Sequence, residues 1–310
     1  MTIRWNAKPT LRRPALVAAF SGWNDAADAA SDGVRWLARN VSARVFATLD
    51  TEEYLDFQAA RPTVELVDGV IREIQWPALA FSAGSVPGGR DLVLLLGVEP
   101  NLRWPMFCED VINVARQTGC EMVVTLGALL GDVPHTRKIR CTGSATDETL
   151  AARLGMQRSR YEGPTGIVGV LHDSARRTGF ASASIWVPVP HYVATAPNPK
   201  ATHALLECLG ALLDIGLELT ELEIAASAWE RSVDEVVAGD ADARSYVERL
   251  ETRYDTADDG PGWLESDEEI AVVDADDDED DEDWFDEDEL PSGESLAEDF
   301  ERYLREQGDE

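Results

Sequence analysis

The residues best suited to chemistry lie in a polar loop that follows a short apolar run at residues 122–126. The loop holds Asp132, His135 and Arg137 within six residues, with two further cations shortly after them. Several cations around an imidazole could bind an anion, or His135 could transfer a proton. The structural alternative is that Asp132 pairs with Arg137 and that His135 only satisfies backbone groups. The sequence alone leaves both interpretations open.

Two more loops place polar residues directly after apolar runs. Glu99 ends one such run, and His191 with Tyr192 follows residues 182–187 through two prolines that make a stiff exit. These prolines could include a cis peptide bond. If the runs are parallel strands, their carboxyl ends meet at one edge of a sheet, where ligands usually bind. His191 and Tyr192 could then line the same crevice as His135, although ordinary packing of these loops is the alternative.

The fourth candidate is the turn Ser21-Gly-Trp-Asn-Asp25, which follows the pattern of a buried strand at residues 15–20. Asn24 or Asp25 can cap a helix that follows the turn. The turn lacks the glycine spacing of nucleotide-binding loops, so a plain strand-to-helix connection in which Trp23 fills a gap is the alternative to a ligand site. The candidate ligand-binding residues are Ser21, Trp23, Asn24, Asp25, Glu99, Asp132, His135, Arg137 and His191.

Catalytic and metal-binding motifs are not found in the sequence. There is no G-x-S-x-G nucleophile motif, and the four histidines have no i, i+4 pairing. We therefore predict no catalytic residue, no metal and no cofactor. Cys108, Cys120, Cys141 and Cys208 are scattered without a C-x-x-C pair, which argues against a zinc site and a disulfide framework and fits a reducing cytoplasm.

The net charge of −32 is concentrated near the end of the chain. Residues 255–289 contain 20 acidic and no basic residues, which predicts a disordered acidic linker. The remainder is mildly acidic and has no basic stripe, which argues against nucleic-acid binding. Residues 1–13 lack the apolar core of a signal peptide, and no apolar window is long enough for a membrane span. We expect a cytoplasmic protein that has no contact with a membrane.

Apolar runs that alternate with helical patterns predict an α/β fold with a largely parallel sheet. The hydrophobic pattern also predicts a hairpin at residues 64–76 around Asp68-Gly69. A short helix is expected after Ser144, with Asp147 as its capping partner. The expected strands are residues 15–20, 43–49, 92–98, 122–126, 167–171 and 182–187, and the longer helices are residues 106–118 and 200–215.

We expect four units along the chain: an α/β core domain at residues 1–216, a helical hairpin at 217–254, the acidic linker at 255–289, and a terminal amphipathic helix at 290–310. Gly239-Asp240 is the expected break in the hairpin. Ser295 to Glu298 has the form of a capping box, and an apolar face follows it. A helix of about three turns is unstable alone in water, so it should dock on its own body or on another protein.

Several motifs in a fixed order resemble the family named after the second proteasome assembly chaperone, in its actinobacterial branch. They are FSGWNDAA at residues 20–27, GALLGDVPHTR at 127–137, YEGPTGIVG at 161–169 and VPVPHYV at 187–193. The resemblance implies a three-layer domain similar to the purine nucleoside phosphorylase fold, with a helical subdomain and a role in proteasome assembly. Some relatives end in a hydrophobic-Tyr-any residue tail, which this chain lacks because Tyr303 is seven residues from the end.

Two functions are compatible with these patterns. The first is a non-catalytic, proteasome-assembly-chaperone-like protein that acts through protein contacts. Its expected partners are further copies of itself and proteasome subunits or another assembling complex. The alternative is a small-molecule-binding protein or enzyme that uses the crevice at the carboxyl ends of the strands.

Overall fold

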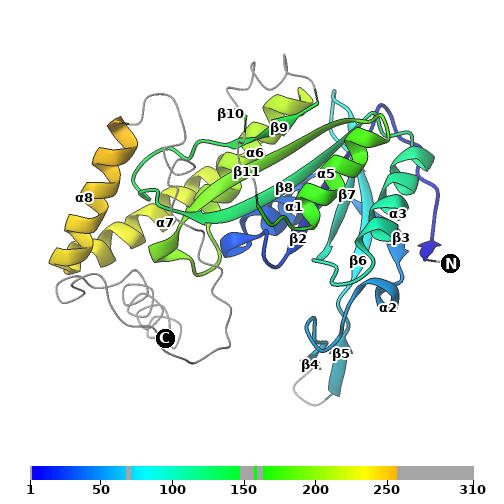
Figure 1. Ribbon diagram of the computed structural model, residues 1–310, viewed down its shortest axis with the longest axis horizontal. Coiled ribbons are helices and arrows are strands. Elements are labelled where there is room, and N and C mark those ends of the chain that lie inside the picture. Colours follow the sequence, from blue (N-terminus) through cyan, green and yellow to red (C-terminus); the bar gives the residue numbers. More distant parts are fainter. Residues whose placement is uncertain (1, 68–70, 147–156, 159–162, 257–310) are drawn as a thin grey trace.

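A nine-stranded mixed sheet runs through the computed structural model, which describes residues 2–67, 71–146, 157–158 and 163–256 (Figure 1). The strand order is β1-β3-β6-β7-β2-β8-β11-β9-β10, and the four central strands β7, β2, β8 and β11 are parallel. The strands are β1 (Ile3–Trp5), β2 (Ala15–Ser21), β3 (Arg44–Leu49), β6 (Leu79–Ser85), β7 (Asp91–Val98), β8 (Met122–Gly131), β9 (Thr142–Ala145), β10 (Gln157–Arg158) and β11 (Ala181–Pro190).

Strand β2 explains why the molecule has three layers. Its residues 15–20 are fully buried, and their side chains point alternately into two separate hydrophobic cores. Helices α1 (Ala29–Asn40) and α6 (Pro199–Leu213) pack on one face of the sheet. Helices α3 (Trp104–Gln117) and α5 (Ile167–Arg177) cover the other face (Figure 1). A strand covered on both faces has a continuous apolar sequence, so the predicted α/β class is confirmed.

A helical hairpin extends from this body. Helices α7 (Thr220–Gly239) and α8 (Ala241–Thr256) meet at Asp240, at the predicted break. Helix α7 packs along α6, and a third small core joins Val233 and Leu250 of the hairpin to Tyr192. Among the described residues, no helix is both long and apolar enough to cross a membrane.

The predicted β-hairpin forms a separate two-stranded sheet that projects from the body (Figure 1). Strands β4 (Thr63–Val67) and β5 (Ile71–Gln75) are antiparallel, and Val64 lies opposite Ile74. The short helical elements are η1 (Ala26–Asp28), α2 (Thr51–Tyr54) and η2 (His191–Val193).

Several expected elements differ from the structure. Residues 167–171 begin helix α5 instead of forming a strand, because a short apolar run fits either pattern. Strand β8 continues beyond residue 126 to Gly131. The cis peptide bond precedes Pro197, not a proline of β11. Helix α8 continues to Thr256, so Asp255 and Thr256, the first two residues of the expected linker, are helical.

The cysteines require a further correction. The sequence argued against a disulfide framework, yet Cys141 and Cys208 form a disulfide that joins the chain before β9 to helix α6. Their separation of 67 residues hides this proximity from sequence inspection. The helix expected around Asp147, the rest of the linker expected at residues 255–289 and the terminal helix all lie outside the described residues.

Candidate functional site

The turn after β2 and the residue after β7 meet in a buried hydrogen-bond cluster. Asn24 is 1% exposed and donates from Nδ2 to Glu99 Oε1 over 2.6 Å. The same carboxylate oxygen accepts the backbone N–H of Ile167, at the start of α5, over 2.9 Å. The first N–H groups of a helix have no partner within it, and the helix dipole favours a negative charge there. Glu99 therefore ties two strand-end turns to the N-terminus of α5.

Gly166, the residue before α5, lies directly against the side chain of Asn24. A Cβ atom at residue 166 would lie 2.3 Å from Asn24 Nδ2 and 2.5 Å from Asn24 Oδ1. The amide of Asn24 therefore rests directly against the backbone before α5. The Asn24 side chain thus packs closely against Gly166, beside the carboxylate of Glu99 that caps the N-terminus of α5.

Asp25 caps the helix that follows it, as one of the two predicted capping residues. Its Oδ1 accepts the N–H groups of Ala30 and Ser31 over 2.8 and 3.0 Å, across the intervening η1 turn. Burial of the carboxyl group raises the pKa of Asp25. A parallel bridge to Ala128 of β8 fixes the turn in place. The side chain thus has a defined structural role at the start of α1.

His135 is buried between a tyrosine and the helical hairpin. Tyr192 Oη accepts the backbone N–H of His135 and lies 2.8 Å from its Nδ1, while His135 Nε2 lies 3.0 Å from Asp234 Oδ1 on α7. These contacts fit a neutral ring that accepts from Tyr192 and donates from Nε2 to the carboxylate. Burial lowers the pKa of His135 and favours this neutral form. Both ring nitrogens therefore have partners within the protein.

His191 makes a second connection to the same hairpin. Its Nδ1 lies 3.1 Å from Asp132 Oδ1, and its Nε2 lies 3.0 Å from Tyr246 Oη on α8. Arg253 of α8 also contacts Asp132, over 3.3 Å. The hydrogen bond from His191 lowers the pKa of Asp132. Asp132 therefore pairs with His191 and Arg253 and not with Arg137, contrary to the structural alternative raised by the sequence.

Arg137 holds the end of helix α8. Its guanidinium contacts Glu251 over 2.9 Å and Asp255 over 2.7 Å. Nearby, Tyr254 donates its hydroxyl hydrogen to the carbonyl of Lys138 over 2.5 Å. The contacts of His135, His191, Asp132 and Arg137 with the helical hairpin form one boundary. It lies between the loops that follow β8 and β11 and helices α7 and α8, and we call it the loop–hairpin seam. The seam is built from polar and charged pairs that join distant parts of the sequence.

The predicted site residues thus fall into two groups with different partners. Asn24, Asp25 and Glu99 surround the starts of α1 and α5, and Ser21 at the end of β2 donates to the carbonyl of Gly97 on β7. The second group, Asp132, His135, Arg137 and His191, lies in the loop–hairpin seam, and Trp23 is 55% exposed. His135 and His191 both contact the ring of Tyr192, and the centroid of each histidine ring lies 5.8 Å from the centroid of the tyrosine ring. Ligand binding by these residues stays a prediction.

The helical hairpin contributes partners that no sequence pattern indicated. Asp234, Tyr246 and Glu251 are 55 to 115 residues from the groups that they contact. Acidic residues on a helix surface normally face water, so their spacing gives no sign of a long-range contact. The only available hint was the alternation of acidic residues with Tyr246 and Tyr254 along one helix.

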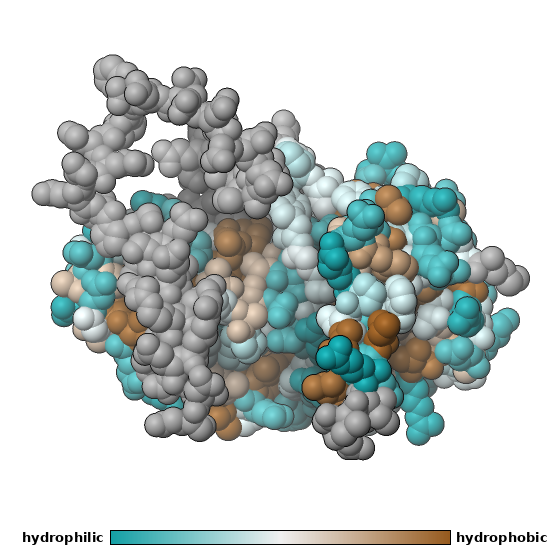
Figure 2. Space-filling model, turned by 90° about the horizontal axis from the view of Figure 1, so that it is seen from below, coloured by the Kyte–Doolittle hydropathy of each residue, from teal (hydrophilic) through white to brown (hydrophobic). Residues whose placement is uncertain are grey.

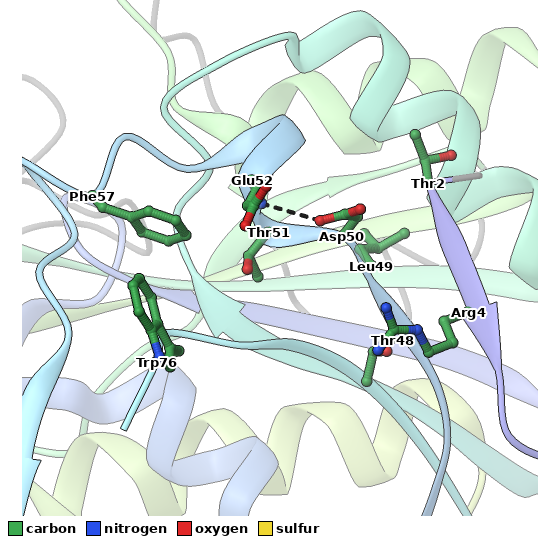
Figure 3. Close-up of a pocket in the computed structure, with 9 residues that line it drawn as sticks. All are labelled: Thr2, Arg4, Thr48, Leu49, Asp50, Thr51, Glu52, Phe57 and Trp76. Carbon is green, nitrogen blue, oxygen red and sulfur yellow. Dashed lines mark hydrogen bonds between the residues drawn. The ribbon is translucent and has the colours of Figure 1, made fainter. Parts of the chain in front are cut away.

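A pocket of about 320 Å³ lies elsewhere, between β1, the end of β3, α2 and the foot of the β4–β5 hairpin. Figure 3 shows Phe57 and Trp76 on one side, Arg4 on the other, and Asp50 and Glu52 between them. The two aromatic rings pack edge to face with centroids 5.0 Å apart. None of the nine predicted site residues lines this pocket. Within the described ranges, no three His, Cys, Asp or Glu side chains are grouped as a metal site.

These features define a class of three-layer α/β protein in which a helical hairpin is tied over the carboxyl ends of the central strands. The family model described as the PAC2 family matches residues 19–237, which include both the β2 turn and most of α7. The chain belongs to the PAC2 family. The resemblance carried by the sequence motifs is thereby confirmed.

Solved structures similar to this chain include two bacterial proteins of the same kind. A PAC2 family protein from Streptomyces avermitilis is 47% identical, covers 76% of this chain and 99% of its own, and has a TM-score of 0.70. A proteasome-assembly chaperone homologue from Mycobacterium tuberculosis is 46% identical over 75% of this chain and 99% of its own, with a TM-score of 0.70. A protein of unknown function from Corynebacterium glutamicum is 26% identical, with coverages of 82% and 97% and a TM-score of 0.76. No curated protein matches the chain.

Proposed function

We propose that this protein is a proteasome-assembly-chaperone-like factor that acts through protein contacts and catalyses no reaction. The observation that carries the proposal is its 46% identity to the proteasome-assembly chaperone homologue of Mycobacterium tuberculosis, across nearly the whole of that chain. Partners of this kind are proteasome subunits or another complex during its assembly. Self-association of the chain, which the sequence analysis also predicts, belongs to the same proposal.

The state of the two seam histidines supports a role without catalysis. A general base needs a nitrogen within hydrogen-bond reach of a substrate. His135 is 2% exposed, and Tyr192 and Asp234 occupy both of its ring nitrogens. His191 is likewise bound to Asp132 and Tyr246. These histidines stabilise the attachment of the helical hairpin.

We assign the partner contacts to the outer surface of the helical hairpin. Helices α7 and α8 are covered on one side by α6 and the seam, and most of their remaining residues are exposed. Ile224 near the start of α7 is 66% exposed, which makes it the most exposed large hydrophobic residue in the described structure. An apolar side chain that projects from a helix can enter a pocket of a partner protein, which makes Ile224 the position to test.

The test is an affinity purification of the tagged full chain from its own host after chemical crosslinking. Proteasome subunits should be enriched several-fold over a tag-only control, and a deletion strain should accumulate incompletely assembled proteasomes on native gels. Ile224→Asp should weaken the enrichment, whereas Glu223→Gln, at an exposed neighbouring position, should preserve it. Unchanged assembly in the deletion strain, together with no enrichment of any proteasome subunit, would contradict the proposal.

A further inference from the structure

One face of the β4–β5 hairpin is apolar and open to solvent. The register places Val64 opposite Ile74 and Leu66 opposite Arg72, so these four side chains share a face. Trp76, two residues after Ile74, continues that face toward the pocket of Figure 3. The apolar members are each between 57% and 63% exposed. We call Val64, Leu66, Ile74 and Trp76 the hairpin apolar face.

The opposite face of the hairpin has a different character. Glu65 lies directly opposite Glu73, and both side chains are exposed. Figure 2, which views the molecule from the hairpin side, shows hydrophobic side chains gathered over β4 and β5 beside hydrophilic ones. The exposed area of the hairpin apolar face is on the order of 400 Å², the size of the largest apolar patch on a typical monomer. Such a patch is typical of an interaction surface.

The size of the face argues against a second copy as its occupant. Two such faces packed symmetrically would bury about 800 Å² in total, whereas a stable protein–protein interface buries at least roughly 1,200 Å². A short segment tethered to the same chain needs much less area, because the tether supplies a high effective concentration. The occupant that fits is therefore an intramolecular one.

The chain carries a segment of matching size and character after its last described residue. At helical spacing, residues 295–304 place Leu296, Phe300, Tyr303 and Leu304 on one side. Ten residues of helix are about 15 Å long, and the five-residue strands of the hairpin are about 17 Å long. The segment is too short to be stable as an isolated helix, so it requires a surface.

Charge complements this fit. Arg72 lies on the hairpin apolar face, across from Leu66. In helical projection, Asp299 and Glu301 flank the apolar side of the terminal segment. Docking of the two apolar faces would bring an acidic residue near the guanidinium of Arg72. The acidic pair Glu65 and Glu73 lies on the other side of the hairpin, away from the segment.

The tether is long enough for this contact. Helix α8 ends at Thr256, and 38 residues separate it from Ser295. A chain of that length can span about 120 Å when extended, and its acidic charges favour extension. A 256-residue domain has a radius of gyration of about 18 Å, so the tether can reach any point of the surface. It can therefore reach from α8 to the hairpin, which lie well apart in Figure 1.

We propose that residues 295–304 dock as an amphipathic helix on the hairpin apolar face of the same chain. Arg72 on the hairpin and Asp299 beside the apolar side of the terminal segment are suitable positions for crosslinking, because their replacement keeps every apolar side chain of the contact. The full chain with Arg72→Cys and Asp299→Cys is treated with a bismaleimide, and Glu73→Cys with Asp299→Cys is the matched control on the opposite face. Of the native cysteines, Cys108 and Cys120 are buried and the other two form the disulfide.

We expect the Arg72→Cys/Asp299→Cys chain to crosslink at least fivefold faster than the control, with the product at monomer size. Equal rates for the two pairs would overturn the proposal, and so would a product found only at dimer size. Hydrogen exchange of the full chain gives a second measurement. Phe300→Asp should raise exchange of residues 63–76 at least threefold, whereas Arg305→Ala, which changes the net charge equally, should leave it unchanged. Identical exchange in both variants would also refute the docking.

Discussion

The Nε2 atom of His135 lies 3.0 Å from Oδ1 of Asp234, which joins the loop after β8 to helix α7 across 99 residues of sequence. The histidine is buried, whereas about half of the aspartate side chain is exposed. The contact therefore lies at the boundary between the body and the helical hairpin. It makes the loop–hairpin seam the part of the molecule where stability and attachment of the hairpin can be tested together.

Removal of the His135 ring should destabilise the fold. His135→Ala leaves the hydroxyl group of Tyr192 without its ring partner and creates a cavity, at a cost of about 2–4 kcal/mol in the free energy of unfolding. Asp234→Asn retains an oxygen that can accept from Nε2, so it should cost less than about 1 kcal/mol. Urea unfolding followed by circular dichroism measures both variants. Equal losses in the two variants would contradict this account of the contact.

The buried histidine should also make stability depend on pH. Because burial lowers the pKa of His135, the unfolded chain takes up its proton first as the pH falls. The free energy of unfolding should therefore decrease below about pH 6.5, the ordinary value for histidine. His172 is also buried with a lowered pKa and contributes in the same direction. Asp132, whose pKa is lowered by its hydrogen bond from His191, contributes only below about pH 4.

The contribution of His135 can be isolated by a difference measurement. His135→Gln does not titrate, so wild type should lose more stability than this variant between pH 7 and pH 5. Urea midpoints at pH 7, 6 and 5 supply the comparison. Parallel curves for the two proteins would show that His135 titrates alike in the folded and unfolded states.

Asp25 should tolerate loss of its charge but not of its side chain. Burial raises the pKa of its carboxyl group, so the charged form is disfavoured in the folded protein. The free energy of unfolding is therefore lowered as the pH rises above about 4, where the unfolded chain loses this proton first. Asp25→Asn keeps an oxygen for the N–H groups of Ala30 and Ser31 and should leave stability at pH 7 unchanged or higher. Asp25→Ala removes the cap and should cost about 1–2 kcal/mol. Thermal unfolding of both variants at pH 7 tests this order.

Gly166 should be intolerant of a side chain. Its Cβ would lie 2.3 Å from Asn24 Nδ2, so Gly166→Ala must displace the amide that holds Glu99. We expect a loss of about 1–3 kcal/mol in the free energy of unfolding. Gly216→Ala is the control, because nothing lies within 4 Å of a Cβ built there. Similar midpoints for both alanine variants would contradict close packing at the β2 turn.

Arg137 should control local opening of helix α8. Arg137→Ala removes the contacts to Glu251 and Asp255, so amide exchange in residues 246–256 should accelerate several-fold while α7 stays protected. Arg244→Ala is a suitable control, because Arg244 donates from Nε to the carbonyl of Asp240 within the same hairpin. Mass spectrometry resolves the two peptides. Uniform acceleration across both helices would mean that the hairpin opens as one unit.

The extent to which the sequence predicts this structure depends on the range of each interaction. The central strand β2 is evident because burial on both faces makes residues 15–20 uniformly apolar. Helix α5 is not evident from the sequence, because the short apolar run in its first turns fits a strand equally well. The side chain that caps this helix at Ile167 is Glu99, 68 residues earlier. The seam depends on pairs such as Asp132 and Arg253, 121 residues apart, and neither local propensity nor spacing encodes such a pair.

The loop–hairpin seam also has a consequence for synthesis on the ribosome. His135 and Asp132 leave the exit tunnel about a hundred residues before Asp234 and Arg253, their partners on the hairpin. During that interval the carboxyl edge of the nascent sheet exposes the Tyr192 cluster and a histidine destined for burial. Domains fold as their residues emerge, so the translation of roughly the last third of the chain completes this edge. A stalled or truncated product that ends before α7 would therefore leave the Tyr192 cluster exposed to chaperones and proteases.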